Sequence, residues 1–474
     1  MDHEEGLVAS TDHGPPQLVA TATPSAHQPP QPPLPARTPD PPIFTALHWS
    51  PDGTTLLLPT SHQTLETYIL PPDLLSAPSP SSTSSTSSPN DHHHHDHHTL
   101  YPYHTSPLPE PSSATTIHPS FTLSLPQTCL YLTSPRNLPI RLISPFATQG
   151  ILASYPLIHT RTETYTAANA LLFNPLDHGA SFFAGAGRLV AHFDVQRDGE
   201  GPVGVCVLGK GRKRHGRLAG GMGYLRAARG ERGIGGVASA LDFGVERGVL
   251  AVGMYKGKCV GLLDGKSVGE EGVVGTLTLP REEGHAADGV TSVRFCPGPG
   301  RGDYLLVAER VSEVMRVFDV RKGGVPLATL RGREALTHQR LGVDVTEEGE
   351  VWAGGTDGMV RVWEGMGMQE GDVEPSSVWQ GHQDAIGGLG LHPGGAGVLA
   401  TCAGSRHLDD SGESKGTQGR SDGFMELNDE SSDSDSSSSS DLSISSTSSI
   451  TSSSASDEPS IQKATGKGLN IWAL

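Results

Sequence analysis

The 474-residue sequence has few aromatic side chains and no long apolar run, and each shortage excludes a class of protein. Aromatic residues make up 5% of the chain, whereas Gly and Pro number 59 and 37, a composition that favours short strands and tight turns over long helices. No stretch of about 18 apolar residues is present, and the N-terminus has neither the basic nor the apolar region of a secretory signal. We therefore expect a soluble intracellular protein without a membrane partner.

Paired cysteines and catalytic motifs are also missing. The five cysteines are spread singly with no C-x-x-C pair, so neither a disulfide framework nor a thiolate zinc site is predicted. No phosphate loop, dinucleotide turn, G-x-S-x-G or H-E-x-x-H motif occurs. The run HHHHDHH at residues 92–98 lies in a Ser/Pro-rich stretch with no rigid structure to orient metal ligands. We therefore interpret it as a low-complexity repeat and not as a metal site. The sequence predicts no enzyme, cofactor, metal or small-molecule substrate.

Low-complexity stretches separate the parts that can fold. Residues 1–42 are predicted to be a disordered arm, because Pro is frequent from about residue 14 and removes backbone donors that a sheet needs. The segment QLVATAT at 17–23 is a weak candidate for an outer strand within this arm. From residue 43, alternating apolar positions flank the turn tetrapeptide SPDG at 50–53, which is typical of successive antiparallel strands.

The same pattern of strands and turns recurs along the chain. The clearest copy covers residues 347–365, where Asp357 and Gly358 form the hairpin turn and Trp363 stands at the Trp position of a WD repeat. The preceding copy ends in Phe318-Asp319, about 45 residues earlier, as expected for this repeat. Weaker copies lie at 128–146, 169–195 and 237–265. The sequence therefore predicts an all-β, seven-bladed WD-repeat β-propeller over residues 43–404, with disordered insertions near 76–113 and 209–233.

The seventh blade is predicted to begin at Gly381-His382, a pair that WD repeats place before the innermost strand. We interpret His382 as a structural residue that hydrogen-bonds within its blade. Residues 405–467 are rich in Ser, Asp and Glu and are predicted to be a disordered insertion. The end of the chain, 468–474, has the apolar alternation and the Trp472 of a closing strand. An ordinary disordered tail is the alternative.

One segment of the sequence indicates a particular family more specifically than the WD-type repeats do. The segment NLPIRLISPFATQGILASYPLIHTRTETYTAANALLFNP at 137–175 resembles the junction of the second and third blades in the telomerase Cajal-body WD-repeat proteins and their fungal splicing-associated relatives. The start FTALHWSPDG, the following YILPPDLL and the segment THQRLGVDVTEEGEVWAGGTDGMVRVWEG resemble the same family. The Pro- and Ser-rich insertions favour the fungal branch.

This resemblance implies a non-catalytic nuclear scaffold. The animal members bind Cajal-body and telomerase RNAs, and the fungal members associate with spliceosomal particles and aid mRNA splicing. The implied partners are small nuclear RNA or the proteins of small nuclear ribonucleoproteins (snRNPs), with other proteins on the propeller faces. The alternative function is a generic WD-repeat adaptor regulated by phosphorylation of its acidic Ser-rich segment.

The strongest local charge signal is a basic segment at residues 209–233. It could neutralise RNA phosphates, serve as a nuclear import signal, or be only a solvated loop. All three interpretations remain open from the sequence. The residues that carry the two functional interpretations are Lys210, Arg212, Lys213, Arg214, Arg217, Arg226 and Arg229.

Overall fold

The computed structural model describes residues 16–25, 41–75, 97–147, 150–159, 161–208, 234–257, 259–266, 268, 273–280, 289–322, 324–395, 397–405 and 467–474. The chain divides into two units, Met1–Ser405 with Lys463–Leu474, and Arg406–Gln462. The second unit lies outside the described residues. The described part of the chain contains strands and two 3₁₀ helices, Pro126–Thr128 and Pro175–Asp177, and none of its helices is long and apolar enough to cross a membrane.

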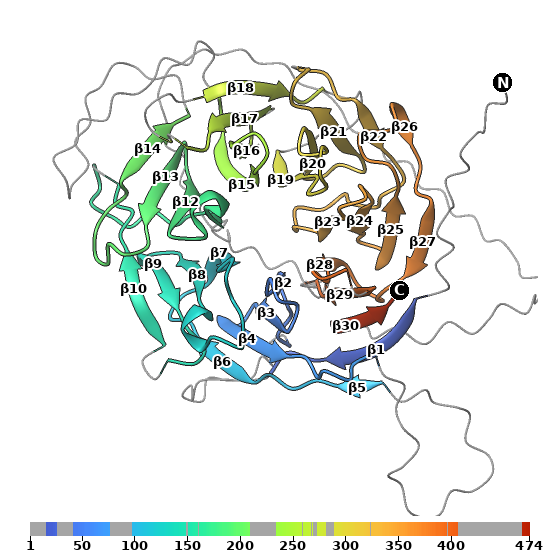
Figure 1. Cartoon of the computed structure of the whole chain (residues 1–474), viewed down its shortest axis with the longest axis horizontal. Coiled ribbons are helices and arrows are strands. Elements are labelled where there is room, and N and C mark those ends of the chain that lie inside the picture. The colour runs from blue at the N-terminus through green and yellow to red at the C-terminus, as the bar shows by residue number, and fades with distance from the viewer. Residues whose placement is uncertain are drawn as a thin grey trace, which may run out of the picture. The chain divides into compact units, whose positions relative to one another are not determined.

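Seven mainly antiparallel sheets are arranged around a central axis, which confirms the predicted all-β seven-bladed propeller (Figure 1). Each blade is given from its innermost strand outward. Blade 1 has β2 (His48–Trp49), β3 (Thr55–Pro59), β4 (Thr64–Ile69) and β6 (His104–Pro107). Blade 2 has β7 (Ser112–Ile117), β8 (Tyr131–Pro135), β9 (Ile140–Ile143) and β10 (Ile151–Tyr155). Blade 3 has β11 (Ala170–Phe173), β12 (Ser181–Ala186), β13 (Leu189–Asp194) and β14 (Gly204–Val207).

The remaining blades follow in chain order around the ring. Blade 4 has β15 (Val237–Gly244), β16 (Val249–Tyr255), β17 (Cys259–Asp264) and β18 (Val273–Thr278). Blade 5 has β19 (Val290–Phe295), β20 (Tyr304–Glu309), β21 (Met315–Asp319) and β22 (Ala328–Leu330), and β26 (Gly371–Val373) adds a parallel edge strand. Blade 6 has β23 (Val343–Val345), β24 (Val351–Gly354), β25 (Met359–Trp363) and β27 (Ser377–Gln380).

Blade 7 combines strands from both ends of the chain. Its inner strands are β28 (Ile386–Leu391) and β29 (Val398–Ala403), followed by β30 (Gly468–Ala473), β1 (Gln17–Ala22) and the parallel strand β5 (His98–Thr99). β30 lies between β29 and β1, with Asn470 opposite both Thr401 and Thr21. The ring is therefore closed by antiparallel pairing of an N-terminal and a C-terminal strand.

The structure has strands inside two segments that the sequence predicts to be disordered, and the first of these strands is the outer-strand candidate at 17–23. The arm predicted over residues 1–42 contains β1, because alternate side chains in QLVATA are buried in blade 7 and the strand has apolar residues at a period of two. The insertion predicted near 76–113 contains β5 and β6, and β7 begins at Ser112. These three strands are rich in Ser, Thr and His, so backbone pairing holds them in the sheets without an apolar alternation that the sequence would reveal.

The few aromatic side chains gather where blades pack together. Phe182 and Phe193 stack with ring centroids 4.9 Å apart, and Tyr155 packs edge-on against Phe182 at 5.0 Å, between blades 2 and 3. The Tyr155 hydroxyl donates to the Val195 carbonyl at 2.6 Å, so its polar end is satisfied within the core. Elsewhere the core consists mainly of aliphatic side chains on paired strands.

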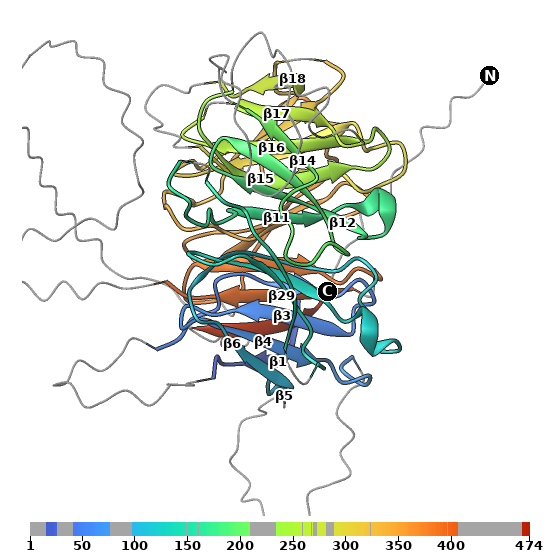
Figure 2. The ribbon, with the colours of Figure 1, turned by 90° about the vertical axis from the view of Figure 1, so that its left-hand side faces the viewer.

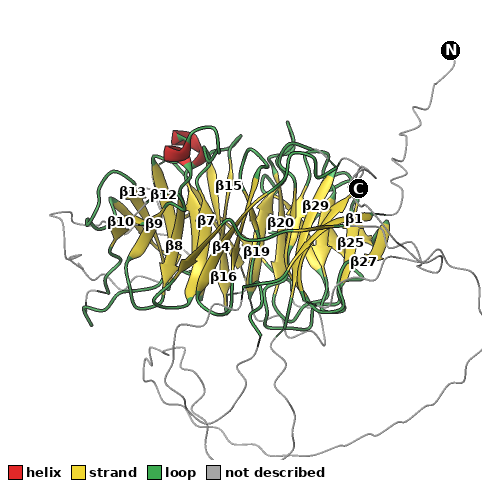
Figure 3. Ribbon diagram, turned by 90° about the horizontal axis from the view of Figure 1, so that it is seen from below, coloured by secondary structure: helices red, strands yellow, loops and turns green. Residues whose placement is uncertain are grey.

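The strands run between two faces, which Figures 2 and 3 show from the side and from below. One face is where each innermost strand begins and where the second and third strands of a blade are joined. We call it the entry face. The exit face is the opposite one, where each innermost strand ends; both 3₁₀ helices lie in its connections, and helix is drawn in red in Figure 3.

Candidate nucleic-acid interface

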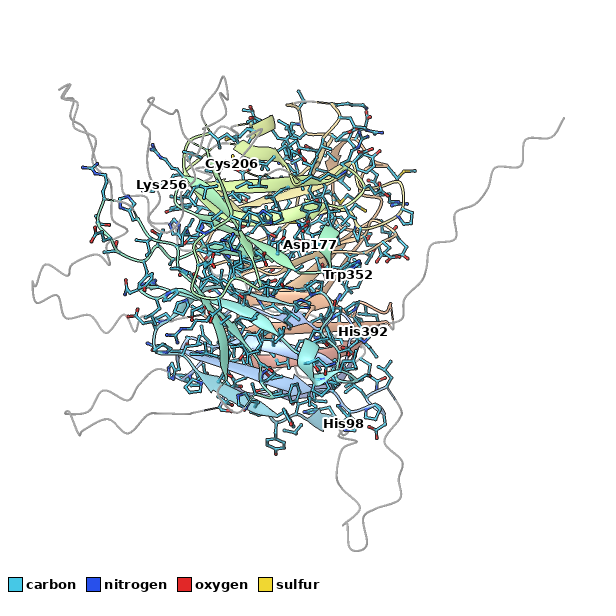
Figure 4. All side chains as sticks on the ribbon, turned by 60° about the vertical axis from the view of Figure 1, so that its left-hand side comes forward. His98, Asp177, Cys206, Lys256, Trp352 and His392 are labelled. Atoms are coloured by element: carbon cyan, nitrogen blue, oxygen red, sulfur yellow. The ribbon has the colours of Figure 1, made fainter. Side chains whose placement is uncertain are left out.

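Four cationic side chains belong to entry-face connections of blades 4 to 6. Lys256 lies in the turn between β16 and β17, and Arg310 follows β20. Arg333 and Arg340 lie in the connection from blade 5 to blade 6. Figure 4 shows Lys256 on the side of the molecule opposite His392 and Trp352, which belong to the exit end.

Arg340 reaches across the ring from this connection. Its Nη2 donates to the carbonyl of Asn169 in blade 3 at 3.0 Å and to that of Ser239 in blade 4 at 2.7 Å. Burial, followed by repulsion from Arg310, lowers the pKa of Arg340 to about 10, so the group remains charged at neutral pH. Because both acceptors are neutral carbonyls, these bonds fix the guanidinium in place without cancelling its charge.

Arg310 and Lys256 share an aromatic neighbour. The Arg310 guanidinium lies 4.9 Å from the centroid of the Tyr255 ring, and the Lys256 ammonium lies 5.9 Å from it. Arg310 Nη1 donates to the His338 carbonyl at 2.9 Å, while its buried Nε has no hydrogen-bond partner among the described residues. The Nε is buried and out of reach of a ligand, so contact with a phosphate or a nucleobase would fall to the Nη groups and the tyrosine ring.

Arg333 is 3% exposed, and its Nε donates to the Gly354 carbonyl at 3.0 Å. Its Nη2 has no partner within the described part of the chain. Burial, with a smaller contribution from Arg361, lowers the pKa of Arg333 to about 10. Other cations nearby are neutralised: Arg361 pairs with Asp357 at 2.7 Å, and Arg316 pairs with Glu309. The four remaining cations thus add positive charge to the entry face of blades 4 to 6, on a chain whose net charge is -18.

The predicted basic segment, residues 209–233, lies outside the described residues, so the structure does not place its seven named cations. The residues that flank it are placed. Leu208 donates its backbone N–H to the Arg188 carbonyl at 2.8 Å, in the turn between β12 and β13, and Ile234 is buried before β15. Both flanks therefore attach the segment to the entry face, which also carries Lys256 and the three arginines.

The WD-repeat residues named from sequence lie inside the blades. His382 is fully buried, with its Nε2 2.9 Å from Thr401 Oγ1, and Trp472 Nε1 donates to the same oxygen at 2.9 Å. Asn470 Nδ2 donates to the Gly381 carbonyl at 3.0 Å. This network joins the start of blade 7 to β29 and β30, so the imidazole of His382 faces strands and not a ligand.

The corresponding residues of blades 5 and 6 have similar positions. Trp363 is fully buried, and its Nε1 donates to the Arg331 carbonyl at 3.1 Å. Asp357 accepts from Arg361 in the hairpin turn. Phe318 is fully buried and Asp319 is 2% exposed, with its carboxylate paired to Arg321. Hydrogen bonding to Arg321 holds the pKa of Asp319 below its usual value.

Sequence reasoning missed Lys256, Arg310, Arg333 and Arg340. None of them lies in a run of basic residues, since Lys256 and Arg333 each have a single further cation two positions away, Lys258 and Arg331. Their blades are brought together only in the closed ring. They could have been found after the strands of each blade were assigned, because all four lie in connections on the entry face. The segment REALTHQR at 333–340 is one such connection.

His48 lines a cavity at the exit end of the propeller, and its pKa provides a pH prediction. Burial, with a smaller contribution from Arg294, lowers its pKa to about 4. In the unfolded chain this imidazole is protonated below pH 6.5, whereas in the folded chain it stays neutral down to about pH 4. The stability that depends on the neutral imidazole is therefore complete above pH 6.5 and decreases as pH falls from 6.5 to 4. Between pH 7 and 4.5 we expect the free energy of unfolding to fall further in the wild type than in His48→Gln. The difference between the two falls should be at most about 3 kcal/mol. Urea titrations at each pH measure it.

The control for this prediction is His338→Gln, because the His338 side chain is exposed. Its pH profile should match that of the wild type. Equal profiles for the wild type and His48→Gln would contradict a neutral buried imidazole at position 48.

Comparison with known proteins found relatives but no matching family model. Guanine nucleotide-binding protein negative regulator 1 of Schizosaccharomyces pombe is 26% identical over 374 residues, which cover 78% of this chain and 82% of that protein. Telomerase Cajal body protein 1 of Mesocricetus auratus is 26% identical over 382 residues, 80% of this chain and 61% of the relative. The Homo sapiens protein of the same name is 26% identical over 368 residues, 77% and 58%. The chain thus spans about six-tenths of the length of these animal relatives.

Proposed function

We propose that this chain, which belongs to the family of telomerase Cajal body WD-repeat proteins, is a non-catalytic nuclear scaffold that binds small nuclear RNA on its entry face. The observation that carries the proposal is the pair Lys256 and Arg310 over the Tyr255 ring, with Arg340 close enough to Arg310 for their charges to interact. Arg333 lies in the same entry-face connection as Arg340. No carboxylate neutralises these cations among the described residues. The names of the animal relatives support a Cajal body setting, and the roles in mRNA splicing and snRNP assembly belong to the same proposal.

Crosslinking followed by RNA sequencing in the source organism is the direct test. We expect enrichment of small nuclear RNAs over the transcripts recovered with an unrelated propeller. Recovery of background RNA alone would overturn the proposal. The same experiment identifies the RNA, which decides between a spliceosomal particle and a small Cajal body or telomerase RNA.

Neutralising the entry face should weaken RNA binding and reduce its salt dependence. For the double variant Lys256→Gln/Arg310→Gln we expect about tenfold weaker binding of a single-stranded RNA and a salt slope smaller by roughly one to two units, because each lost phosphate contact releases about one counterion fewer. Fluorescence anisotropy from 50 to 300 mM salt measures both quantities. The variant Arg212→Gln/Lys213→Gln/Arg214→Gln tests the basic segment in the same assay.

The matched control removes two exposed cations from the exit face, Lys266→Gln/Lys322→Gln. It makes the same change in net charge as the first variant. Equal losses in the two variants would show that only overall charge matters. An unchanged slope in the triple variant would leave nuclear import as the role of the basic segment.

A generic adaptor is the second candidate function. It is favoured by the Schizosaccharomyces pombe relative, whose name describes a negative regulator of a guanine nucleotide-binding protein. The Ser-rich acidic segment at 426–446 then provides sites for acid-directed kinases. Affinity purification that returns a signalling complex and no ribonucleoprotein would favour the adaptor over the RNA scaffold.

A further inference from the structure

The exit face holds a cavity of about 980 Å³. Its wall is built from blades 5, 6, 7, 1 and 2, at the points where their innermost strands end. Figure 4 shows His392 and Trp352, which both line it, on the side of the molecule away from Lys256. The cavity is thus separate from the proposed RNA face.

The charged lining of this cavity is mainly acidic. One cation, Arg294, faces a set of four carboxylates, which are Asp344, Glu347, Glu348 and Glu350. The side chains of Glu347 and Glu348 are exposed, and neither makes a hydrogen bond or ion pair within the described part of the chain. The carboxylates of Glu347 and Glu348 therefore add negative charge at the mouth, while Arg301 Nη1 lies nearby and donates to the backbone carbonyl of Glu348.

The other two carboxylates have partners that fix them. Asp344 accepts the backbone N–H of Leu391 at 2.8 Å and that of Val345 at 3.0 Å, and Glu350 accepts from Trp352 Nε1 at 3.0 Å. Burial raises the pKa of Asp344, and the Arg294 charge opposes that shift. These groups hold blades 6 and 7 in register and shape the interior, whereas Glu347 and Glu348 remain available at the mouth.

An aromatic wall completes the cavity. Trp49 Nε1 donates to the Gly390 carbonyl at 2.8 Å, and the indole packs edge-on against His392 with ring centroids 5.1 Å apart. A Cβ at position 390 would lie 2.9 Å from the Trp49 ring, so glycine permits this close approach. The Trp49 indole is half-buried and fixed by these two contacts. Its ring face is therefore a preorganised surface for the cationic side chain of a ligand.

We infer that this cavity binds a Lys- or Arg-containing peptide segment of a partner protein. The mouth attracts the cationic side chains, Trp49 contacts their aliphatic stems, and the volume holds several side chains at once. Phosphate-bearing ligands are repelled by the same carboxylates. A bound metal ion does not fit, because the described residues contain no group of three His, Cys, Asp or Glu placed to hold one.

The probe is a fluorescein-labelled peptide of alternating Gly and Arg, compared with the same peptide carrying neutral citrulline in place of Arg. We expect micromolar, salt-sensitive binding of the Arg peptide to the full chain and none of the citrulline peptide. Glu347→Gln/Glu348→Gln should weaken binding about tenfold, since two exposed ion pairs are lost. Arg294→Gln should strengthen it about threefold, because the opposing cation is removed.

The matched control is Glu364→Gln/Glu370→Gln, which neutralises two exposed carboxylates of the same blade that do not line the cavity. Its effect should stay below twofold. Equal effects of the two Gln pairs, equal binding of the citrulline peptide, or no binding of the Arg peptide at millimolar concentration would each overturn the inference. A saturating single-stranded RNA should leave peptide binding unchanged, and displacement by RNA would place the peptide on the entry face instead.

Discussion

Deletion of residues 468–474 is expected to abolish folded, soluble protein. β30 lies between β29 and β1, so its loss leaves two unpaired strand edges in blade 7 and opens the ring. Leu469 and Ile471 are fully buried and Trp472 is 2% exposed. The single change Trp472→Ala removes the packing against Trp379 and the bond to Thr401, and should lower the free energy of unfolding by about 3–5 kcal/mol. Soluble yield and urea unfolding measure the two variants.

The control for this prediction is Met368→Ala, because Met368 is a large apolar residue that is 75% exposed. Its free energy of unfolding should stay within about 0.5 kcal/mol of the wild type. A deletion variant with the yield and melting temperature of the wild type would contradict a closing role for β30.

The blades that could be predicted from sequence are those with strong local signals. Blade 6 has the Asp357-Gly358 turn and Trp363, and blade 5 ends its third strand in Phe318-Asp319, so both can be phased by inspection. β7, with the sequence SSATTI, has six half-buried side chains and no apolar alternation. Such a strand is specified by the partners it pairs with, β8 beside it and β2 and β11 on neighbouring blades. A single sequence does not report those partners.

The candidate site was harder to predict than the fold, because its charges meet only in the closed ring. Arg340 bonds to Asn169 and Ser239, which are 171 and 101 residues away in the chain. The local sequence therefore identified the contiguous basic segment and missed the cations assembled from three blades. The exit cavity has the same origin, since Arg294, Asp344 and Trp49 come from three different blades.

Removing one partner of the buried ion pair in blade 5 is the second large expected effect. Glu309 ends β20, and Arg316 lies on β21; their side chains are 5% and 3% exposed, and Arg316 Nη1 donates to Glu309 Oε2. Glu309→Ala removes the carboxylate that pairs with the buried guanidinium of Arg316, and we expect this change to lower the free energy of unfolding by about 3–5 kcal/mol. The double variant Glu309→Leu/Arg316→Met replaces both charges by apolar groups and should recover most of that loss.

The exposed pair Arg331–Asp372, with side chains 37% and 60% exposed, is the matched control. Asp372→Ala should cost less than about 1 kcal/mol, because water solvates the remaining cation. A Glu309→Ala variant no less stable than Asp372→Ala would contradict the buried pair. Because Glu309 pairs with Arg316, we expect RNA affinity to depend on Arg310 and Lys256 in the adjacent turns and not on Arg316. The double variant Glu309→Leu/Arg316→Met should therefore bind RNA with the affinity of the wild type.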